Sequence, residues 1–413
     1  MYKKILSLAF ILVSLQGMAQ KKKALFIIVD GVPADVMEKI DPPYMKAIAA
    51  DGAYLRMHQG GDLGTYNETP TISSPGYANV VTGVWLNKHN VKDNQIKDPD
   101  YHYPTIFKLF KNQYPGKKIG VYSTWEDNRT KLLGDGLPQT GNLKVDIHYD
   151  GYERDTVRFK VDEFGDKFYQ IDKLVATEAA GSIKRDAPDL SWVYLEETDS
   201  KGHRFGDSPG YVDALKRVDK EIGLIYEAIR YREQHFHEDW LLLITTDHGR
   251  TELDGKKHGG QTDRQRNTWL VTNKKNLNAY ATTYNPSAVD LLPTITRFMN
   301  VKPAKEIQYE LDGTPLMGPV SVAELHSYFV QGNLVVTWKA LDKIGNVKIW
   351  VATTNNYKTG GKDNYMLLGE FPVGQKHATV DVSRYPSSFY KLVVEAPHNM
   401  LNTWVTPAPV SAK

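Results

Sequence analysis

Short, unbroken runs of apolar residues recur along the first three quarters of the chain. They occupy residues 24–29, 190–195, 240–245 and 268–272 and contain many valines, isoleucines and leucines. A run of this length and composition is typical of a strand that is buried on both faces of a parallel sheet. Residues 118–123 are a fifth candidate strand.

Segments with helical character stand between these runs. They span residues 37–51, 101–112, 168–182, 209–232 and 288–299. Strands that alternate with helices predict an α/β fold, here a mainly parallel sheet sandwiched by helices. Residues 135–166 are polar and aromatic without clear periodicity, and we interpret them as an insertion that covers the carboxyl edge of the sheet.

The pattern changes after the proline-rich stretch 315–319. Five segments then alternate apolar and polar residues, and they are separated by Gly, Asn and Pro turns: 334–338, 347–353, 365–371, 378–382 and 390–395. This pattern predicts a small all-β sandwich. The predicted organisation is a catalytic domain over residues 20–318 and an accessory β module over residues 319–413.

The N-terminus predicts a secretory signal peptide over residues 1–19. Lys3 and Lys4 precede an apolar run over residues 5–15, and small residues follow up to Ala19, where we expect cleavage. A membrane anchor is the alternative, but the run is about half the length that a spanning helix needs. A periplasmic or secreted protein without a membrane span is therefore expected.

Composition narrows the chemistry further. The chain has 413 residues, which is enough for two domains, and a net charge of +2, which implies no surface for nucleic acid or another polyanion. It contains no cysteine. Disulfides, a lipid-modified N-terminal cysteine and cysteine-based metal or redox chemistry are thereby excluded.

Acidic and imidazole side chains follow several of the predicted buried strands. These residues are Asp30, Asp199, His203, Asp247, His248 and His258. Ligands of open α/β sheets bind at the carboxyl ends of strands, where these side chains would meet. Three carboxylates and three imidazoles suit two Zn²⁺ ions, which can clamp the attacking and leaving oxygens of a phosphoryl displacement.

A nucleophile is predicted within residues 69–83, where Ser73 and Ser74 directly precede Pro75. Proline suits the first position of a helix, and Gly83 can end that helix. A hydroxyl at a helix N-terminus lies where negative charge is favoured. A plain serine N-cap is the alternative interpretation of this stretch.

Three motifs together resemble the alkaline phosphatase superfamily, most closely its nucleotide pyrophosphatase/phosphodiesterase branch, over residues 24–317. They are YLEETDSKGHRFG at 194–206, PTISSP at 70–75 and HNVKDN at 89–94. The resemblance implies one zinc held by Asp30, Ser73, Asp247 and His248, and a second held by Asp199, His203 and His258. It further implies that Ser73 attacks phosphorus to form a phospho-serine intermediate and that Asn94 binds a phosphoryl oxygen.

Three departures from the branch bear on the substrate. Ser73 stands where the branch has threonine, Ser74 replaces a base-stacking phenylalanine, and His258 follows His248 by only ten residues. Trp125 is a candidate substrate-binding aromatic that can equally belong to the core. We interpret Glu196 and Glu197 as supporting groups.

The leading hypothesis is a secreted two-zinc phosphodiesterase or pyrophosphatase that acts on a small-molecule phosphate ester. A phosphomonoesterase of the same fold is the alternative, a sulfatase is disfavoured, and a non-catalytic binding protein is the hypothesis from another class. The partner of the β module stays open between a spacer and a lectin-like role.

Overall fold

The computed structural model describes residues 20–40, 42–161 and 166–406. The predicted signal peptide over residues 1–19 lies outside the described residues. Among the described helices, none combines the length and the hydropathy that crossing a bilayer requires.

A seven-stranded sheet forms the centre of the larger unit, in the order β2-β7-β6-β1-β5-β3-β4. Strands β1, β3, β4, β5 and β6 are mutually parallel, whereas β7 runs antiparallel to β6 and β2 antiparallel to β7. Their bounds are Lys21–Val29 (β1), Ala53–His58 (β2), Ile119–Ser123 (β3), Ile147–Tyr149 (β4), Leu190–Leu195 (β5), Glu238–Thr245 (β6) and Asn267–Thr272 (β7).

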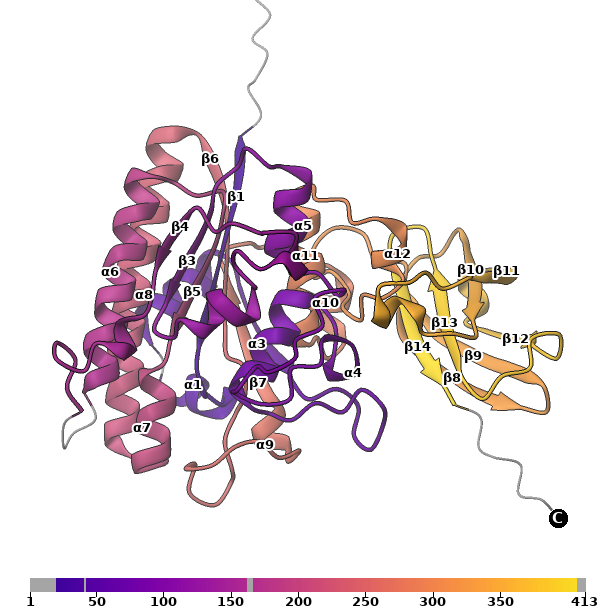
Figure 1. Ribbon diagram of the computed structural model, residues 1–413, viewed down its shortest axis with the longest axis horizontal. Helices are drawn as coiled ribbons and strands as arrows, with labels where there is room; N and C mark the ends of the chain where they lie inside the picture. The colour runs from indigo at the N-terminus through magenta and orange to yellow at the C-terminus, as the bar shows by residue number, and fades with distance from the viewer. Residues whose placement is uncertain (1–19, 41, 162–165, 407–413) are drawn as a thin grey trace, which may run out of the picture.

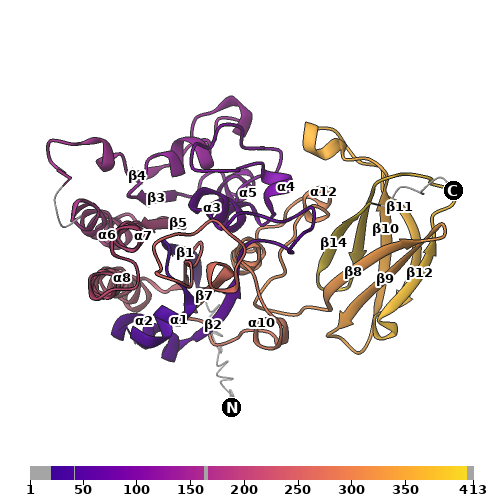
Figure 2. The same ribbon diagram turned by 90° about the horizontal axis from the view of Figure 1, so that it is seen from below.

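Helices cover both faces of this sheet, as the apolar runs predicted (Figures 1 and 2). In β1, Ala24, Phe26 and Ile28 enter one core with α3, α5 and α11, and the alternate residues enter a second core with α1, α2, α6 and α8. The helix bounds are Ala34–Ile40 (α1), Pro43–Asp51 (α2), Ser73–Thr82 (α3), Leu86–His89 (α4), Ile106–Gln113 (α5), Lys167–Arg185 (α6), Glu197–Phe205 (α7), Pro209–Phe236 (α8), Asp263–Arg266 (α9), Ala279–Thr283 (α10), Leu291–Phe298 (α11) and Lys305–Gln308 (α12).

Some predicted boundaries were wrong. The helix expected over residues 37–51 is two helices, α1 and α2, because Pro42 and Pro43 interrupt it; a proline nitrogen cannot donate within a helix. Helix α3 begins at Ser73, so that Pro75 is its third residue and not its first. This position is tolerated because the first four N–H groups of a helix have no intrahelical partner.

The C-terminal unit packs a four-stranded sheet, β11-β10-β13-β14, on a three-stranded sheet, β12-β9-β8, around a separate apolar core. The predicted α/β fold with a small all-β sandwich is thereby confirmed. The strand bounds are Val322–Val330 (β8), Asn333–Ala340 (β9), Asn346–Ala352 (β10), Met366–Pro372 (β11), His377–Asp381 (β12), Tyr390–Glu395 (β13) and Met400–Val405 (β14). Strands β8 and β14 were missed in the sequence.

Buried polar contacts join the two units, which lie side by side in Figure 1. The ammonium group of Lys88, in α4, bonds to the carboxylate of Asp312 and donates to Asn402 Oδ1 of β14 at 2.8 Å. From the β module, Lys391 pairs with Glu310 of the larger unit and also with Asp363 of its own unit. The β module is therefore held firmly against the segment that closes the larger unit.

Candidate active site

Three strand ends deliver the acidic and imidazole side chains to one edge of the sheet. Asp30 follows β1 directly, Asp247 and His248 follow β6, and α7, which begins two residues after β5, carries Asp199 and His203. Strands β5, β1 and β6 are neighbours and parallel, so their carboxyl ends meet.

Helix α3 places Ser73 against this edge. A side-chain carbon at Gly76 would lie 2.8 Å from the Asp247 carbonyl oxygen and 2.9 Å from Asp247 Cβ, so only glycine permits this approach of helix and strand end. Gly83 ends the helix, as the sequence predicted, and it does so in the left-handed conformation, with φ of 67°. Ser73 is 6 % exposed.

Four ligand-type atoms converge at the first half of the site. The Nε2 atom of His248 lies 3.3 Å from Asp30 Oδ1, 3.3 Å from Asp247 Oδ2 and 3.4 Å from Ser73 Oγ. The two carboxylate oxygens are buried and have no hydrogen-bond partner. Two such oxygens, directed at one nitrogen, require a positive charge between them.

The hydrogen bonding of His248 fits a metal ligand. Its Nδ1 lies 2.9 Å from the carbonyl oxygen of Gly249, which can only accept, so Nδ1 carries the proton and Nε2 faces the carboxylates. Burial alone would lower the pKa of this imidazole, but Asp247 and Asp30 raise it to about 9, which shows how strongly the two carboxylates favour a positive charge at this point. The donor set of this group therefore fits a divalent cation.

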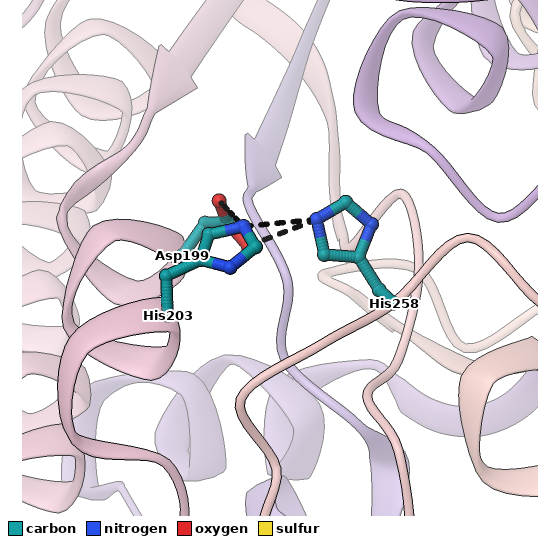
Figure 3. Close-up of side chains that lie close together, drawn as sticks. All are labelled: Asp199, His203 and His258. Atoms are coloured by element: carbon teal, nitrogen blue, oxygen red, sulfur yellow. Dashed lines mark hydrogen bonds and ion pairs between the residues drawn. The ribbon is translucent and has the colours of Figure 1, made fainter.

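Asp199, His203 and His258 form the second half (Figure 3). The Nε2 atoms of the two histidines lie 3.0 Å apart, and Asp199 Oδ2 lies 3.2 Å from His203 Nε2. The Nδ1 of His258 donates to the carbonyl oxygen of Thr71 at 2.9 Å, which leaves Nε2 as the ligand atom. Burial and the charge of His248 lower the pKa of His258 to about 4, so that its imidazole is neutral.

The two halves are direct neighbours. The rings of His248 and His258 stack with centroids 3.8 Å apart, and one ligand atom each of Asp30, Asp199 and His248 lies within 4.8 Å of the others. The structure thus brings together all seven side chains that the sequence assigned to metal ligation.

A cavity of about 330 Å³ opens beside Ser73, and both Asn94 and Trp125 line it. Asn94 Oδ1 accepts the N–H of Ser74 at 3.0 Å, so the amide nitrogen remains as a donor for a phosphoryl oxygen. Trp125 also packs edge-on against the ring of Tyr77, with centroids 6.4 Å apart, and thus contributes to both core and cavity.

Two tyrosines that the sequence reasoning missed orient Asp30. The hydroxyls of Tyr77 and Tyr194 both donate to Asp30 Oδ2, the latter at 2.7 Å. The spacing of Tyr77, four residues after Ser73 on one helix face, was the available signal. The position of Tyr194 in an apolar strand gave none.

The sequence anticipated only part of the cavity wall: Trp125 as a candidate, Glu196 as a supporting group and residues 135–166, which contain Glu153, as a covering insertion, whereas Lys167 and Phe168 were missed. Glu153, Lys167, Phe168 and Glu196 form this wall together with Trp125. The ammonium of Lys167 donates to the carbonyl oxygen of Glu153 at 2.8 Å. Burial and the charge of Asp30 raise the pKa of Glu196 well above its usual range.

A family model for type I phosphodiesterase / nucleotide pyrophosphatase matches residues 24–312, which is more than half of the chain. The chain belongs to this family. The resemblance that the three motifs indicated is therefore confirmed.

Curated members of the type I phosphodiesterase / nucleotide pyrophosphatase family match over part of their length. The chain is 27 % identical over 248 residues to ectonucleotide pyrophosphatase/phosphodiesterase family member 7 of Homo sapiens. This match covers 58 % of this chain and 50 % of that protein. The chain is 26 % identical over 211 residues to family member 1 of Homo sapiens, covering 47 % and 21 %. The chain thus spans half or less of the length of these relatives.

Among solved structures, Ps i-CgsB in complex with k-i-k-neocarrahexaose superposes with a TM-score of 0.52 at 15 % identity, covering 78 % of this chain and 82 % of that one. This likeness concerns the fold.

Proposed function

We propose that this chain is a secreted or periplasmic two-zinc phosphodiesterase or pyrophosphatase that works through a phosphorylated Ser73. The observation that carries the proposal is the convergence of Ser73 Oγ, Asp30 Oδ1 and Asp247 Oδ2 on His248 Nε2, beside the second group of Asp199, His203 and His258. The signal-peptide pattern of residues 1–19 and the family membership support the location and the reaction class.

The proposed ligands are Asp30, Ser73, Asp247 and His248 for one Zn²⁺ and Asp199, His203 and His258 for the other. When bound, the two ions would lower the pKa of the attacking hydroxyl and stabilise the charge on the leaving oxygen. Mixed nitrogen and oxygen donors of this kind suit zinc.

The chain's own residues then perform two displacements. Ser73 Oγ attacks phosphorus, so that the bond from Oγ to phosphorus forms as the bond to the leaving oxygen breaks. Asn94, which Ser74 N–H orients, donates to the non-bridging oxygen on which charge develops. Water then attacks the same phosphorus, releases Ser73 and yields the monoester product.

The charge of the cavity favours a diester over a monoester. A phosphomonoester dianion calls for Arg or Lys beside the nucleophile, but among the described lining residues Lys167 is the single Lys or Arg, and its ammonium donates to a backbone carbonyl. Glu153 and Glu196 line the same cavity and supply no positive charge, and burial raises the pKa of both carboxyl groups. A monoanionic diester is better matched to this wall than a dianion.

The test compares rates on para-nitrophenyl phosphate, bis-para-nitrophenyl phosphate and a nucleotide phosphodiester, with and without chelator. We expect the diesters to be turned over faster and chelator to abolish all three rates. Ser73→Ala should lose turnover but retain its zinc, because six other ligands remain. Chelator-insensitive turnover, or faster hydrolysis of the monoester, would contradict the proposal.

A further inference from the structure

One buried guanidinium holds Asp199 of the second half of the candidate site and the loop that leads to His258. Arg250 follows His248 by two residues, and its side chain is fully buried. Its Nη1 donates to Asp199 Oδ1 at 2.9 Å and its Nη2 donates to the backbone oxygen of Asp199 at 2.9 Å. Arg250 therefore donates hydrogen bonds to both the side chain and the main chain of Asp199, one of the proposed ligands.

The same side chain reaches the loop that leads to His258. Arg250 Nε donates to the carbonyl oxygen of Gly255 at 2.7 Å, and within this loop Thr251 N–H bonds to Lys257 O at 2.8 Å. The guanidinium also lies 5.8 Å from the ring centroid of Tyr211 in α8. Helix α7, the loop 250–258 and the end of β6 are thus tied through one group.

Two glycines make room for this arrangement. A side-chain carbon at Gly202 would lie 2.3 Å from Arg250 Cζ and Nη2, and 2.4 Å from Nε. A side-chain carbon at Gly31 would lie 2.6 Å from Asp199 Oδ1 and 3.3 Å from Arg250 Nη1. Because all three guanidinium nitrogens are hydrogen-bonded, the guanidinium cannot simply swing aside.

We propose that Arg250 is a positioning residue that fixes which oxygen of Asp199 faces the cation held with His203 and His258. Oδ1 is engaged by the guanidinium and lies 3.8 Å from His258 Nε2, whereas Oδ2 is the oxygen turned to His203 Nε2, at 3.2 Å. An arginine suits this task because its planar fork restricts the carboxylate to one orientation. The inference rests on the proposed function, since it assigns a role toward the second of the two proposed zinc ions.

The experiment measures Zn²⁺ binding to metal-free protein by competition with a chromophoric chelator. Arg250→Met keeps much of the side-chain volume without the charge or the donors. Loss of a group that orients a metal ligand costs about 10- to 100-fold in affinity, so we expect one of the two Zn²⁺ ions to bind that much more weakly. The other ion should bind as in the wild type.

Arg232→Met is the matched control. Arg232 is also a buried arginine, and its Nε and Nη2 donate to the carboxylate of Glu238 at 3.0 and 2.6 Å, at the amino end of β6. The Arg232→Met protein should have a lower free energy of unfolding, because a structural contact is lost. It should bind both Zn²⁺ ions with the affinity of the wild type.

Gly202→Ala supplies a second test that retains the arginine, and as a single variant it does not depend on the folding of Arg250→Met. The added carbon should displace the guanidinium and lower the affinity for the same Zn²⁺ ion by about 10-fold or more. In the Arg250→Met background the flexible methionine yields, so the same substitution should change the affinity less than 3-fold.

Wild-type Zn²⁺ affinities at both sites in Arg250→Met, or equal effects of Gly202→Ala in the two backgrounds, would overturn the inference while the proposed function stands. A wild-type chain that binds no Zn²⁺ would overturn both.

Discussion

The Nε2 atoms of His203 and His258 lie 3.0 Å apart, although the two residues come from different elements and 55 positions separate them in the sequence. One sits on α7, whereas the other sits in the loop after β6 and is oriented by its Nδ1 bond to Thr71. Two imidazoles that face each other beside the Asp199 carboxylate match the donor arrangement of the proposed second Zn²⁺ site.

Removal of one of these imidazoles should therefore cost one metal ion. For His258→Ala we expect bound zinc to fall from two ions per chain to one, and kcat to fall by about 100-fold or more. Elemental analysis of the purified protein measures the first quantity. His377→Ala, at an exposed histidine of β12, is the control and should keep both ions. Two tightly bound ions in His258→Ala would show that this residue is not a ligand.

The hydroxyls of Tyr77 and Tyr194, which both donate to Asp30 Oδ2, should each contribute to the orientation of this carboxylate. Tyr77→Phe and Tyr194→Phe each leave one donor, so each should lower kcat/KM by about 10-fold and retain both zinc ions. The double variant leaves this buried carboxylate oxygen without a donor and should also lose zinc from the Ser73 half. Metal content and steady-state kinetics on a diester measure the two effects. Full activity in the double variant would refute this assignment.

Asn94 offers a test of charge stabilisation during the displacement. Asn94→Asp keeps the oxygen that accepts Ser74 N–H but replaces the donating nitrogen with an oxygen. Loss of one such donor costs about 100- to 1,000-fold in kcat. Gln95→Glu introduces the same charge at the exposed neighbouring residue and should change kcat less than 3-fold. Similar losses in both variants would point to a general charge effect instead.

His89 should make the stability of the fold depend on pH. It is buried, its Nδ1 accepts the N–H of Val91 at 3.0 Å, and its Nε2 lies 2.9 Å from Asn79 Oδ1, which fixes a neutral imidazole. Burial, together with the charge of Lys358, lowers its pKa from 6.5 to about 3. The unfolded chain therefore binds a proton between pH 6.5 and 3 that the folded chain does not.

The contribution of neutral His89 to the free energy of unfolding is fully present above pH 6.5. It is lost as the pH falls toward 3, at about 1.4 kcal/mol per pH unit. Urea titrations at several pH values measure the slope. In His89→Gln the slope of unfolding free energy against pH should be smaller by this amount, whereas His377→Gln should leave it unchanged. An unaltered slope in His89→Gln would contradict the assignment.

The strand ends were predictable because their chemistry is local: an apolar run ends and an acidic or imidazole residue follows, as at Asp30 and Asp247. The orientation of these groups was not, because it depends on side chains from other elements. Tyr194 looks like any residue of a buried strand, and Arg250 looks like a surface charge in a polar loop. The need for glycine at position 202 becomes visible only once Arg250 is seen to fill that space.

Strands at the edges of the sheets were also hard to predict from the sequence. Strand β2 contains Arg56 and His58 and stands at the edge of the sheet next to β7, so its sequence lacks the continuous apolar run of a central strand. In β8, Tyr328 and Val330 are exposed as well as Glu324 and His326, and no residue of β14 is fully exposed. Neither strand therefore alternates cleanly between buried apolar and exposed polar residues, and its apolar residues can be assigned only from the core that it shares with β9 and β13. Pairing partners distant in sequence decide these elements.

Anomalous diffraction from crystals of the zinc-loaded protein locates the bound cations. We expect two zinc peaks next to Ser73, one in contact with Asp30, Asp247 and His248 and the other in contact with Asp199, His203 and His258. A single peak, or peaks away from these side chains, would contradict this expectation.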